Sequence, residues 1–569
     1  MLSFAHGLEG SDEGSYLLFV ANPWSSPGLG LFYGFLLHPW WELAGRNVAD
    51  FRLAGWITLG ILVAVFAACL WHFLRRPLSG GWAIVLFASL LLGGFTHYTR
   101  GIRTPGYDYV VLAGALVFCA GWLWLESEKE GRACLPGEAL LAAGIVVLAA
   151  GKWLVVPGYL LLLSLLLWAR RPSGGSSRVW IRLTGWSVLF TILFAMYAGT
   201  AGLMDTWKAG LVYGRSADRD GIVLMYLGWL LGYVWVLLRA LLWVAAVYAI
   251  VWGILRLVFR KQPSTAFVAS IVFVVGLGLA LVRGHGQGGL QSWGKSSMLT
   301  GTWLIGVLLV AQSMTGRPGT FRAAASSPAC RLLLLFSAAP LLNGAGTITG
   351  LTNYLAHGTV FFLAAGWVAL SRASARGLPD HVPAAAMLMI GTLLAARIAT
   401  TPEDVMRVGN VWEADTPVRT GPEAGKLRLH PSSVEALASL DGVMRREGYQ
   451  TGDPVAGWVD LCGLVYLLGG TSPGSSWYLG GISNHLQRVP PEVLQKTFVL
   501  FRQTVPEEPD VSWPHQSGVP PPVLVPANLS WPAGDGEGSP ESIRLYRPAI
   551  SPRASLKPQG QEVFGAGGP

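Results

Sequence analysis

The stretch GSDEGSY, residues 10–16, places two adjacent carboxylates, Asp12 and Glu13, close to the start of the chain. A long segment rich in aromatic residues follows over 22–41, and an apolar helix begins near Arg52. Everything downstream is typical of membrane spans, their connecting loops and a polar tail. Adjacent acids are most often solvated surface residues, but these lie at the edge of a membrane, where charged groups are costly and frequently functional.

The composition excludes an ordinary soluble protein. Of the 569 residues, 52% are hydrophobic and 13% are charged, and 25 are tryptophan, which is typical of a polytopic membrane protein. The apolar runs stop near Arg397, and the remainder has soluble composition. We therefore predict an all-α polytopic membrane bundle over 1–400, whose first outer loop is 1–52. A small C-terminal α/β soluble domain over 401–550 and a disordered tail over 551–569 follow.

The apolar runs predict about twelve membrane crossings, because one crossing needs about 20 apolar residues. The tract 223–258 is too long for one crossing at about 1.5 Å per residue, so we interpret it as an interfacial helix that leads into a single span. Lys152 and Pro157 separate the fourth crossing from the fifth. The predicted crossings are 53–74, 81–97, 108–125, 139–152, 158–169, 183–200, 236–258, 266–282, 298–314, 332–349, 355–371 and 384–399.

The loop charges predict the orientation. With the N-terminus outside, more lysines and arginines fall in inside loops than in outside loops, as the positive-inside rule expects. The net charge of +9 therefore needs no nucleic-acid partner. In a bacterial inner membrane, this orientation makes the acidic pair and the C-terminal domain extracytoplasmic. The outer loops still carry many cations, and a phosphate group is a suitable partner for them.

The C-terminal region predicts a mixture of helices and strands. A helix over 431–447 is indicated by its apolar face and by Gly448 as its stop. We expect a strand over 455–459, a helix or a strand over 461–468, a helix over 491–503 and short strands over 523–525 and 543–545.

Three segments of the N-terminal half carry a resemblance to a known family. They read SDEGSYLLFVANP (11–23), LLHPWWELAGRNVADFRLAGW (36–56) and YTRGIRTPGYDY (98–109). With their acidic pair, aromatic outer loop and following arginine, they resemble the GT-C superfamily of membrane glycosyltransferases. Within it, the chain is similar to bacterial relatives of dolichyl-phosphate-mannose protein mannosyltransferases and aminoarabinose transferases. The specific likeness covers roughly the first 220 residues, and the rest is similar in layout only.

The resemblance implies an inverting glycosyltransferase that takes a sugar from a polyprenyl-phosphate donor on the outer face. The acceptor would be an envelope glycan, a lipid or a protein. Such a transfer needs a base for the acceptor hydroxyl and cations for the leaving phosphate. Asp12 is implied as the base, and Glu13 as the residue that positions it or the sugar. The predicted phosphate-binding residues are Arg52, Arg100, Arg103 and Lys152; Asp108 would orient an arginine, and Tyr16, Lys208 and Arg215 would contact the headgroup or acceptor.

Each of these residues also has a structural explanation. The acidic pair could form ion pairs with Arg46 or Arg52. Arg100 and Arg103 could extend from a helix end to the membrane surface. Lys152 lies in a very apolar setting, where a lysine marks either a site or the end of a helix.

No cofactor and no metal cluster is predicted, since the ten histidines are scattered and a divalent ion would be needed only for a diphosphate donor. The five cysteines are also scattered, so no disulfide framework is indicated. The resemblance implies a span directly before the acidic pair, and residues 1–10 are too short for one. We therefore expect the true start to lie upstream, with a thirteenth span.

Two other classes of function compete with the transferase. A transporter or flippase of a lipid-linked anion would use the outer cations as part of its path, but it would more often show internal repeats and helices broken at mid-membrane. No clear repeat is present in the sequence. A non-catalytic receptor or scaffold would depend on the C-terminal domain, and loss of the Asp12 carboxylate would leave it unaffected.

Overall fold

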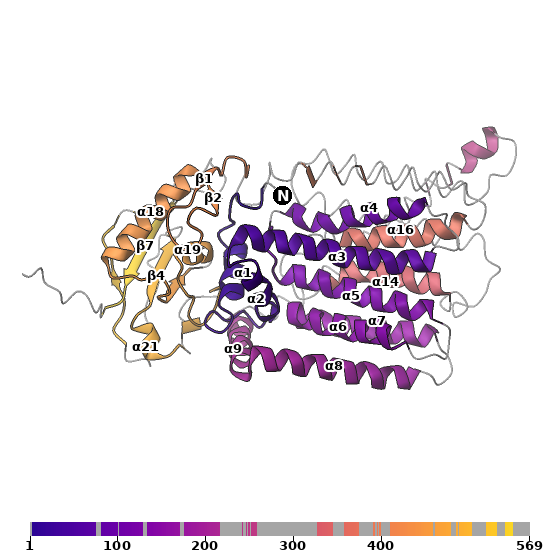
Figure 1. Cartoon of the computed structure of the whole chain (residues 1–569), viewed down its shortest axis with the longest axis horizontal. Helices are drawn as coiled ribbons and strands as arrows, with labels where there is room; N and C mark the ends of the chain where they lie inside the picture. Colours follow the sequence, from indigo (N-terminus) through magenta and orange to yellow (C-terminus); the bar gives the residue numbers. More distant parts are fainter. Residues whose placement is uncertain are drawn as a thin grey trace, which may run out of the picture.

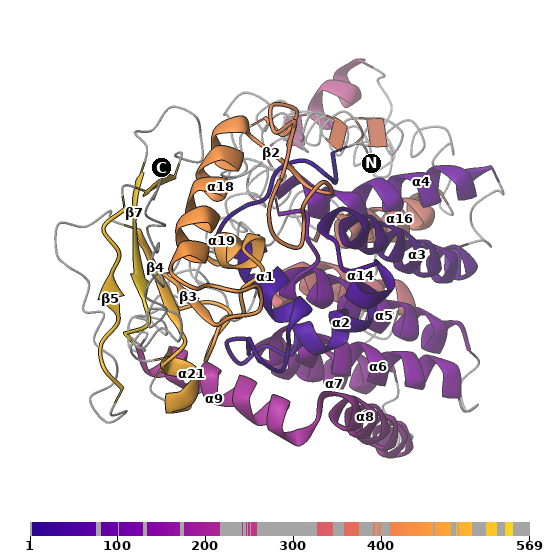
Figure 2. The ribbon, with the colours of Figure 1, turned by 60° about the vertical axis from the view of Figure 1, so that its left-hand side comes forward.

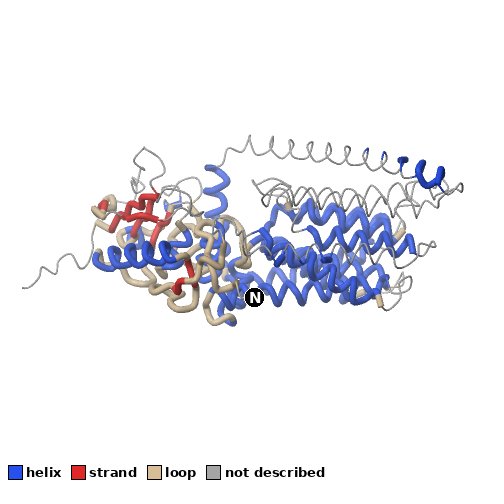
Figure 3. The backbone as a smooth tube through the Cα atoms, turned by 90° about the horizontal axis from the view of Figure 1, so that it is seen from above, coloured by secondary structure: helices blue, strands red, loops and turns tan. Residues whose placement is uncertain are grey.

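The structure is a computed structural model in which a helical bundle carries a smaller domain at one end (Figure 1). Among the residues that the structure describes, the strands lie in the smaller domain, as Figure 3 shows. The described residues are 3–74, 81–100, 102–128, 134–170, 176–216, 252–258, 327–344, 358–374, 410–458, 461–478, 489–502, 519–527, 529–531 and 541–549, with single positions 242, 246, 249, 250, 391, 392, 395, 398, 399, 485 and 486.

The bundle is built from long apolar helices. Within the described residues, four segments are long and apolar enough to cross a membrane, namely Val48–Leu74, Tyr107–Ser127, Leu135–Arg170 and Arg178–Ala198. The helices are α3 (Val48–Leu74), α4 (Trp82–Phe95), α5 (Tyr107–Ser127), α6 (Leu135–Lys152), α7 (Val156–Arg170), α8 (Ser176–Ala198), α14 (Pro328–Asn343) and α16 (Thr359–Ser374). The predicted crossings 236–258, 266–282, 298–314 and 384–399 lie wholly or largely outside the described residues.

The chain reverses at Lys152, as its sequence predicts. The backbone of Lys152 is extended, with ψ 101°, and the short 3-10 helix η2 (Trp153–Val155) follows before α7 begins. The segment 135–170 is therefore two helices that lie side by side in Figure 1. This turn brings Lys152 to the end of the bundle that faces the smaller domain.

Helix α8 presents an apolar surface to its surroundings. Ile181 is 71% exposed and Met196 is 76% exposed, although both side chains are strongly hydrophobic. A continuous exposed apolar face on a long helix is typical of contact with lipid. This surface supports the prediction of an integral membrane protein.

Helices α5 and α6 approach each other closely at two glycines on each helix, Gly114 and Gly121 on α5 and Gly137 and Gly144 on α6. A Cβ on Gly121 would lie 2.7 Å from the backbone nitrogen of Leu141, and a Cβ on Gly144 would lie 2.7 Å from that of Phe118. Glycine removes these clashes and lets the two backbones touch. The closely packed helices α5 and α6 carry Asp108, in the first turn of α5, and Lys152, at the end of α6.

The C-terminal domain has a small sheet flanked by helix α18 (Pro431–Arg446). The strands β3 (Val455–Gly457), β4 (Phe498–Arg502), β7 (Glu541–Arg547) and β5 (Val523–Leu524) lie in that order, and β6 (Leu529–Trp531) also pairs with β7. Only β3 and β4 run parallel; the other pairs are antiparallel. A separate two-stranded sheet joins β1 (Thr416–Pro417) to β2 (Arg428–Leu429).

The structure corrects one element of this domain and decides another. The predicted helix over 491–503 is wrong, because α21 ends at Leu494 and residues 498–502 form β4. The aromatic and β-branched run from Phe498 to Phe501 is buried between β3 and β7, where side chains of this kind fit best. The segment 461–468, left open between helix and strand, contains helix α19 (Cys462–Leu467).

Candidate active site

The acidic pair starts a short helix, α1 (Asp12–Ala21), whose first turn is held by a reciprocal cap. The buried Glu9 carboxylate accepts hydrogen bonds from the backbone N–H groups of Ser11 (3.1 Å) and Glu13 (3.0 Å). In return, the Glu13 carboxylate accepts the N–H of Glu9 at 2.9 Å. Helix N-termini leave such N–H groups unpaired, and the Glu9 carboxylate accepts two of them here. Asp12 lies between the two capped positions, and its backbone is therefore fixed.

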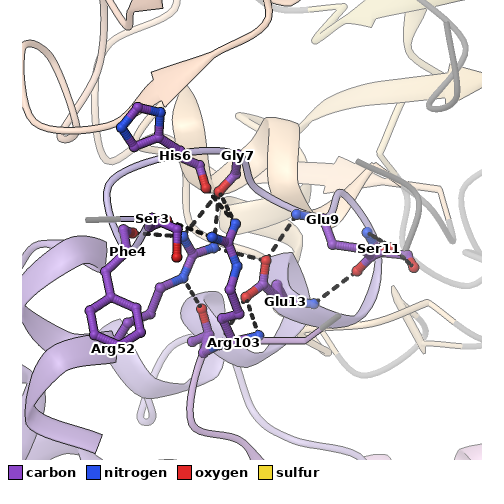
Figure 4. Close-up of polar contacts among 10 residues, drawn as sticks. Ser3, Phe4, His6, Gly7, Glu9, Ser11, Glu13, Arg52 and Arg103 are labelled. Atoms are coloured by element: carbon purple, nitrogen blue, oxygen red, sulfur yellow. Dashed lines mark hydrogen bonds and ion pairs between the residues drawn. The ribbon is translucent and has the colours of Figure 1, made fainter. Parts of the chain in front are cut away.

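Glu13 is fully buried and uses both of its oxygens, as Figure 4 shows. Its Oε2 accepts a hydrogen bond from Nη2 of Arg52 at 2.9 Å. Its Oε1 accepts the backbone N–H groups of Arg103 (2.9 Å) and Thr104 (2.8 Å). With the bond from Glu9, the carboxylate has about the four partners that it can accept. Glu13 is thus ion-paired with Arg52, one of the structural partners expected from the sequence.

These contacts keep Glu13 ionised. Burial alone would raise its pKa, but the charges of Arg52 and Arg103 and the hydrogen bonds that it accepts lower the pKa below its ordinary value. A carboxylate that is deeply buried, saturated with donors and a weak base is poorly suited to take a proton from a substrate. The geometry therefore gives Glu13 a positioning role.

Arg52 is committed to the same cluster. Its side chain is fully buried, and besides Glu13 it donates to the carbonyls of Phe4 (2.8 Å) and Gly7 (3.0 Å) and to the Thr104 hydroxyl (3.2 Å). Every N–H of its guanidinium group thus has an acceptor. A phosphate could contact Arg52 only after one of these bonds was exchanged, so the predicted phosphate contact does not fit this arrangement.

Arg103 holds the N-terminal segment in a similar way. Its guanidinium donates to the carbonyls of Ser3, His6 and Gly7, while its Nε has no partner among the described residues. Burial and the neighbouring charge of Arg52 lower the pKa of Arg103 to about 9, although Glu13 opposes the shift. Two buried arginines beside Glu9 and Glu13 form a charge-balanced cluster, which we call the buried quartet (Glu9, Glu13, Arg52 and Arg103).

A cluster of tyrosines lies next to Asp12. The rings of Tyr16 and Tyr33 meet edge to face at 5.7 Å between centroids, and those of Tyr16 and Tyr107 at 5.4 Å. Tyr33, at the start of α2 (Tyr33–Leu43), is 3% exposed. Burial, followed by the charges of Asp12, Cys462 and Asp108, raises the pKa of Tyr33 well above its ordinary value. The phenol of Tyr33 therefore stays neutral.

Asp108 forms an ion pair with Lys152. The Nζ atom of Lys152 lies 2.8 Å from Oδ1 of Asp108 and 4.6 Å from the centroid of the Tyr107 ring. The Lys152 side chain is 4% exposed and that of Asp108 is 15% exposed. The carboxylate and the aromatic face both attract the cationic side chain of the lysine and hold it in place. The polar centre of the site therefore consists of Asp12, Tyr33, Asp108 and Lys152.

The other predicted contacts are more distant or lie outside the described side chains. Lys208, on α9 (Thr200–Ser216), is exposed and forms an ion pair with Asp205 at 3.3 Å. Arg46 pairs with Glu42 at 2.7 Å. Arg100 ends the 3-10 helix η1 (Thr96–Arg100) and Arg215 lies near the end of α9, and their side chains are outside the described part of the chain.

Two solved structures match this chain at low identity. They are crystal structures of ArnT from Cupriavidus metallidurans, one in the apo state and one bound to undecaprenyl phosphate. Each is 14% identical to this chain and is matched over 96% of this chain and 95% of its own length, with TM-scores of 0.37 and 0.36. ArnT is an aminoarabinose transferase of the GT-C type, the class that the sequence resembles. No protein-family profile and no curated protein matches the chain.

Sequence reasoning missed two members of this region. Glu9 lies four residues before Glu13, and the resulting reciprocal cap was a readable signal. Tyr33 had no such signal, because its contact with Tyr16 depends on the turn that joins α1 to α2. Among the residues that the structure describes, no group of three or more histidine, cysteine, aspartate or glutamate side chains could hold a metal ion.

Proposed function

We propose that the chain is a membrane glycosyltransferase that moves a sugar from a polyprenyl-phosphate donor to a hydroxyl of an envelope glycan, lipid or protein. The observation that supports it most is the shared polar centre. Asp12 begins helix α1, and Tyr16 of that helix contacts the Tyr107 ring. Lys152 lies over the same ring and pairs with Asp108. A base and a cation are the two groups that this transfer requires.

In this proposal, Asp12 is the catalytic base. Its carboxylate accepts the proton of the acceptor hydroxyl, whose oxygen then attacks the anomeric carbon. The bond from that carbon to the phosphate oxygen breaks, and the polyprenyl phosphate leaves with the electron pair, so the configuration at the carbon inverts. The buried quartet fixes the backbone on both sides of Asp12, so the base is held in place without moving during the reaction.

Lys152 is the proposed contact for the leaving phosphate. Its ammonium group sits at the end of α6, over the Tyr107 ring, at the end of the bundle that faces the C-terminal domain (Figure 1). A fixed cation stabilises the negative charge that develops on the phosphate in the transition state. Asp108 holds the lysine in position, while Arg52 and Arg103 hold the N-terminal segment and bind no phosphate themselves.

The reaction proposed for a monophosphate donor requires no divalent ion. In this proposal the site faces the extracytoplasmic side of the membrane. The exposed apolar surface of α8 contacts the lipid. The C-terminal domain, at the same end of the bundle as α1, covers the site from the aqueous side. Tyr16 shapes the wall of the site through its contacts with Tyr33 and Tyr107. Lys208 and Arg215 on α9 would meet the donor headgroup or the acceptor at the membrane surface.

A transfer assay tests the proposal. Purified full chain would be incubated with a panel of radiolabelled polyprenyl-phosphate sugars, beside Asp12→Asn and, as a matched control, Asp415→Asn, which changes an exposed carboxylate of the C-terminal domain. We expect sugar transfer or donor hydrolysis in the unsubstituted chain and in the control, and a loss of about 10²- to 10⁴-fold in Asp12→Asn. Donor binding without turnover in any form would instead favour a transporter.

A further inference from the structure

The C-terminal domain touches the helix that carries Asp12 directly. Helix α19 lies beside α1, as Figures 1 and 2 show. The backbone N–H of Gly463 donates to the carbonyl of Gly10 at 2.6 Å. A Cβ on Gly14 would lie 2.1 Å from the nitrogen of Gly463, and a Cβ on Gly463 would lie 2.8 Å from Cα of Gly10. The two backbones are therefore in contact, with no room for any side chain at either glycine.

The same short helix α19 also reaches the start of span α3. The Tyr466 hydroxyl donates to Oε1 of the buried Glu423, and that oxygen also accepts the backbone N–H of Val48 at 3.2 Å. Val48 is the first residue of α3, one turn before Arg52. A carboxylate from the C-terminal domain thus caps the span that holds Arg52. Burial raises the pKa of Glu423 despite these two hydrogen bonds.

A third contact fixes the segment that precedes Asp12. His6 forms an isolated parallel bridge with Arg428. The N–H of Gly7 donates to the carbonyl of Arg428, and the N–H of Arg428 donates to the carbonyl of Ala5, both at 2.7 Å. The Gly7 carbonyl is also an acceptor of Arg52. The N-terminal segment is thus held between the buried arginine and the C-terminal domain.

We propose that the C-terminal domain is a required part of the active site, and that Gly14 and Gly463 are positioning residues that set the place of Asp12. The inference rests on the proposed function, since it assigns the domain a part in that same reaction. All three contacts lie within the segment 5–14 or at the start of α3, which are the two parts of the chain that carry Asp12 and Arg52. Separation of α19 from α1 would therefore move Asp12 relative to Lys152.

The experiment measures turnover and domain contact together in the full chain. Gly463→Ala would be compared with Gly442→Ala, which changes a glycine of α18 whose nearest heavy atom to an added Cβ is 3.9 Å away. Domain contact is read from Cys462, which is 1% exposed, with a maleimide that labels accessible thiols. The other cysteines, at 69, 119, 134 and 330, would be replaced in all variants.

We expect Gly463→Ala to lower kcat by about 100-fold with little change in the KM for the donor, because a misplacement of about 1 Å is enough for such a loss. Cys462 should become labelled in Gly463→Ala and stay protected in Gly442→Ala. Tyr466→Phe keeps the ring and removes only the hydroxyl that reaches Glu423. Tyr466→Phe should show a smaller fall in kcat and weaker labelling of Cys462. It replaces Gly463→Ala as the test variant if Gly463→Ala does not fold.

Full turnover in Gly463→Ala would overturn the inference, and so would a loss of turnover while Cys462 stayed protected. An equal loss in Gly442→Ala would also overturn it, since that change leaves the contact intact. Failure of the proposed function has a different signature, because the unsubstituted chain itself would then transfer no sugar.

Discussion

At the scale of single residues, the two adjacent acids have different surroundings. Glu13 points into the buried quartet and is saturated with donors, whereas Asp12 is only partly buried. Neighbouring residues in a helix point about 100° apart, so one carboxylate can be buried while the next faces the site. Sequence reasoning could predict that the pair matters and could name Arg52 as a partner. The resemblance implied a base and a positioning residue, but it could not show how Glu13 is held, because that depends on contacts with residues 103 and 104.

The buried ion pair predicts a large and pH-dependent stability effect. Glu13→Gln leaves the Arg52 charge buried without its counterion, so we expect the free energy of unfolding to fall by about 3–5 kcal/mol. The pKa of Glu13 is lowered from its ordinary value of 4.5, so its stabilisation is complete above that pH and is lost as the pH falls through the lowered pKa.

Thermal unfolding of the detergent-solubilised protein at pH 7, 5 and 3.5 measures this effect. The gap in Tm between the unsubstituted chain and Glu13→Gln should be widest at pH 7 and 5 and should narrow at pH 3.5. Asp415→Asn, at an exposed carboxylate, is the control and should unfold like the unsubstituted chain at each pH. A gap that stayed the same at pH 3.5 would show that the charge of Glu13 does not stabilise the fold.

At the scale of helices and strands, most of the described elements follow from the sequence. The reversal at Lys152 and helix α18 agree with the apolar patterns. The error at β4 has a physical cause, because residues 491–503 begin with a helical turn that starts at a proline, and pairing with β3 and β7 makes the rest a strand. The glycines at 114 and 121 and at 137 and 144 were a usable signal for the close contact of α5 and α6.

The glycine contact predicts that one added methyl group will disturb the bundle. Gly144→Ala should lower the free energy of unfolding by about 1–3 kcal/mol, because its Cβ would meet the backbone of Phe118. Gly185→Ala, on the outward-facing α8, has no atom within 4 Å of its added Cβ and is the matched control. Unfolding temperatures of the two variants in the same detergent provide the measurement. Equal values would mean that α5 and α6 are not closely packed.

At the scale of the whole molecule, the parts that form the candidate site come from distant stretches of sequence. Glu13 bonds to residues 90 positions away, and Val48 bonds to Glu423 at a separation of 375. Loop charges could predict that the acidic pair and the C-terminal domain share one side of the membrane, and both lie at the same end of the bundle (Figure 1). They could not predict that the domain touches α1, because a glycine–glycine contact leaves no pattern in either segment.

The orientation predicts which end of the molecule is accessible from outside the cell. In a cysteine-free background, Ser439→Cys on the exposed side of α18 should react with a membrane-impermeant maleimide in intact cells. Ser127→Cys, exposed at the opposite end of the bundle, should react only after the membrane is opened. The reverse pattern of labelling would place the candidate site on the cytoplasmic side and would contradict a donor on the outer face.

The most direct test of the proposed site is a comparison of donor affinity and turnover in Asp12→Asn and Lys152→Met. If Asp12 is the base and Lys152 holds the phosphate, Asp12→Asn should bind the donor nearly as well as the unsubstituted chain and lose about 10²- to 10⁴-fold in kcat. Lys152→Met should bind the donor about 10- to 100-fold more weakly. Turnover that survives in Asp12→Asn, or unchanged donor affinity in Lys152→Met, would contradict this division of roles.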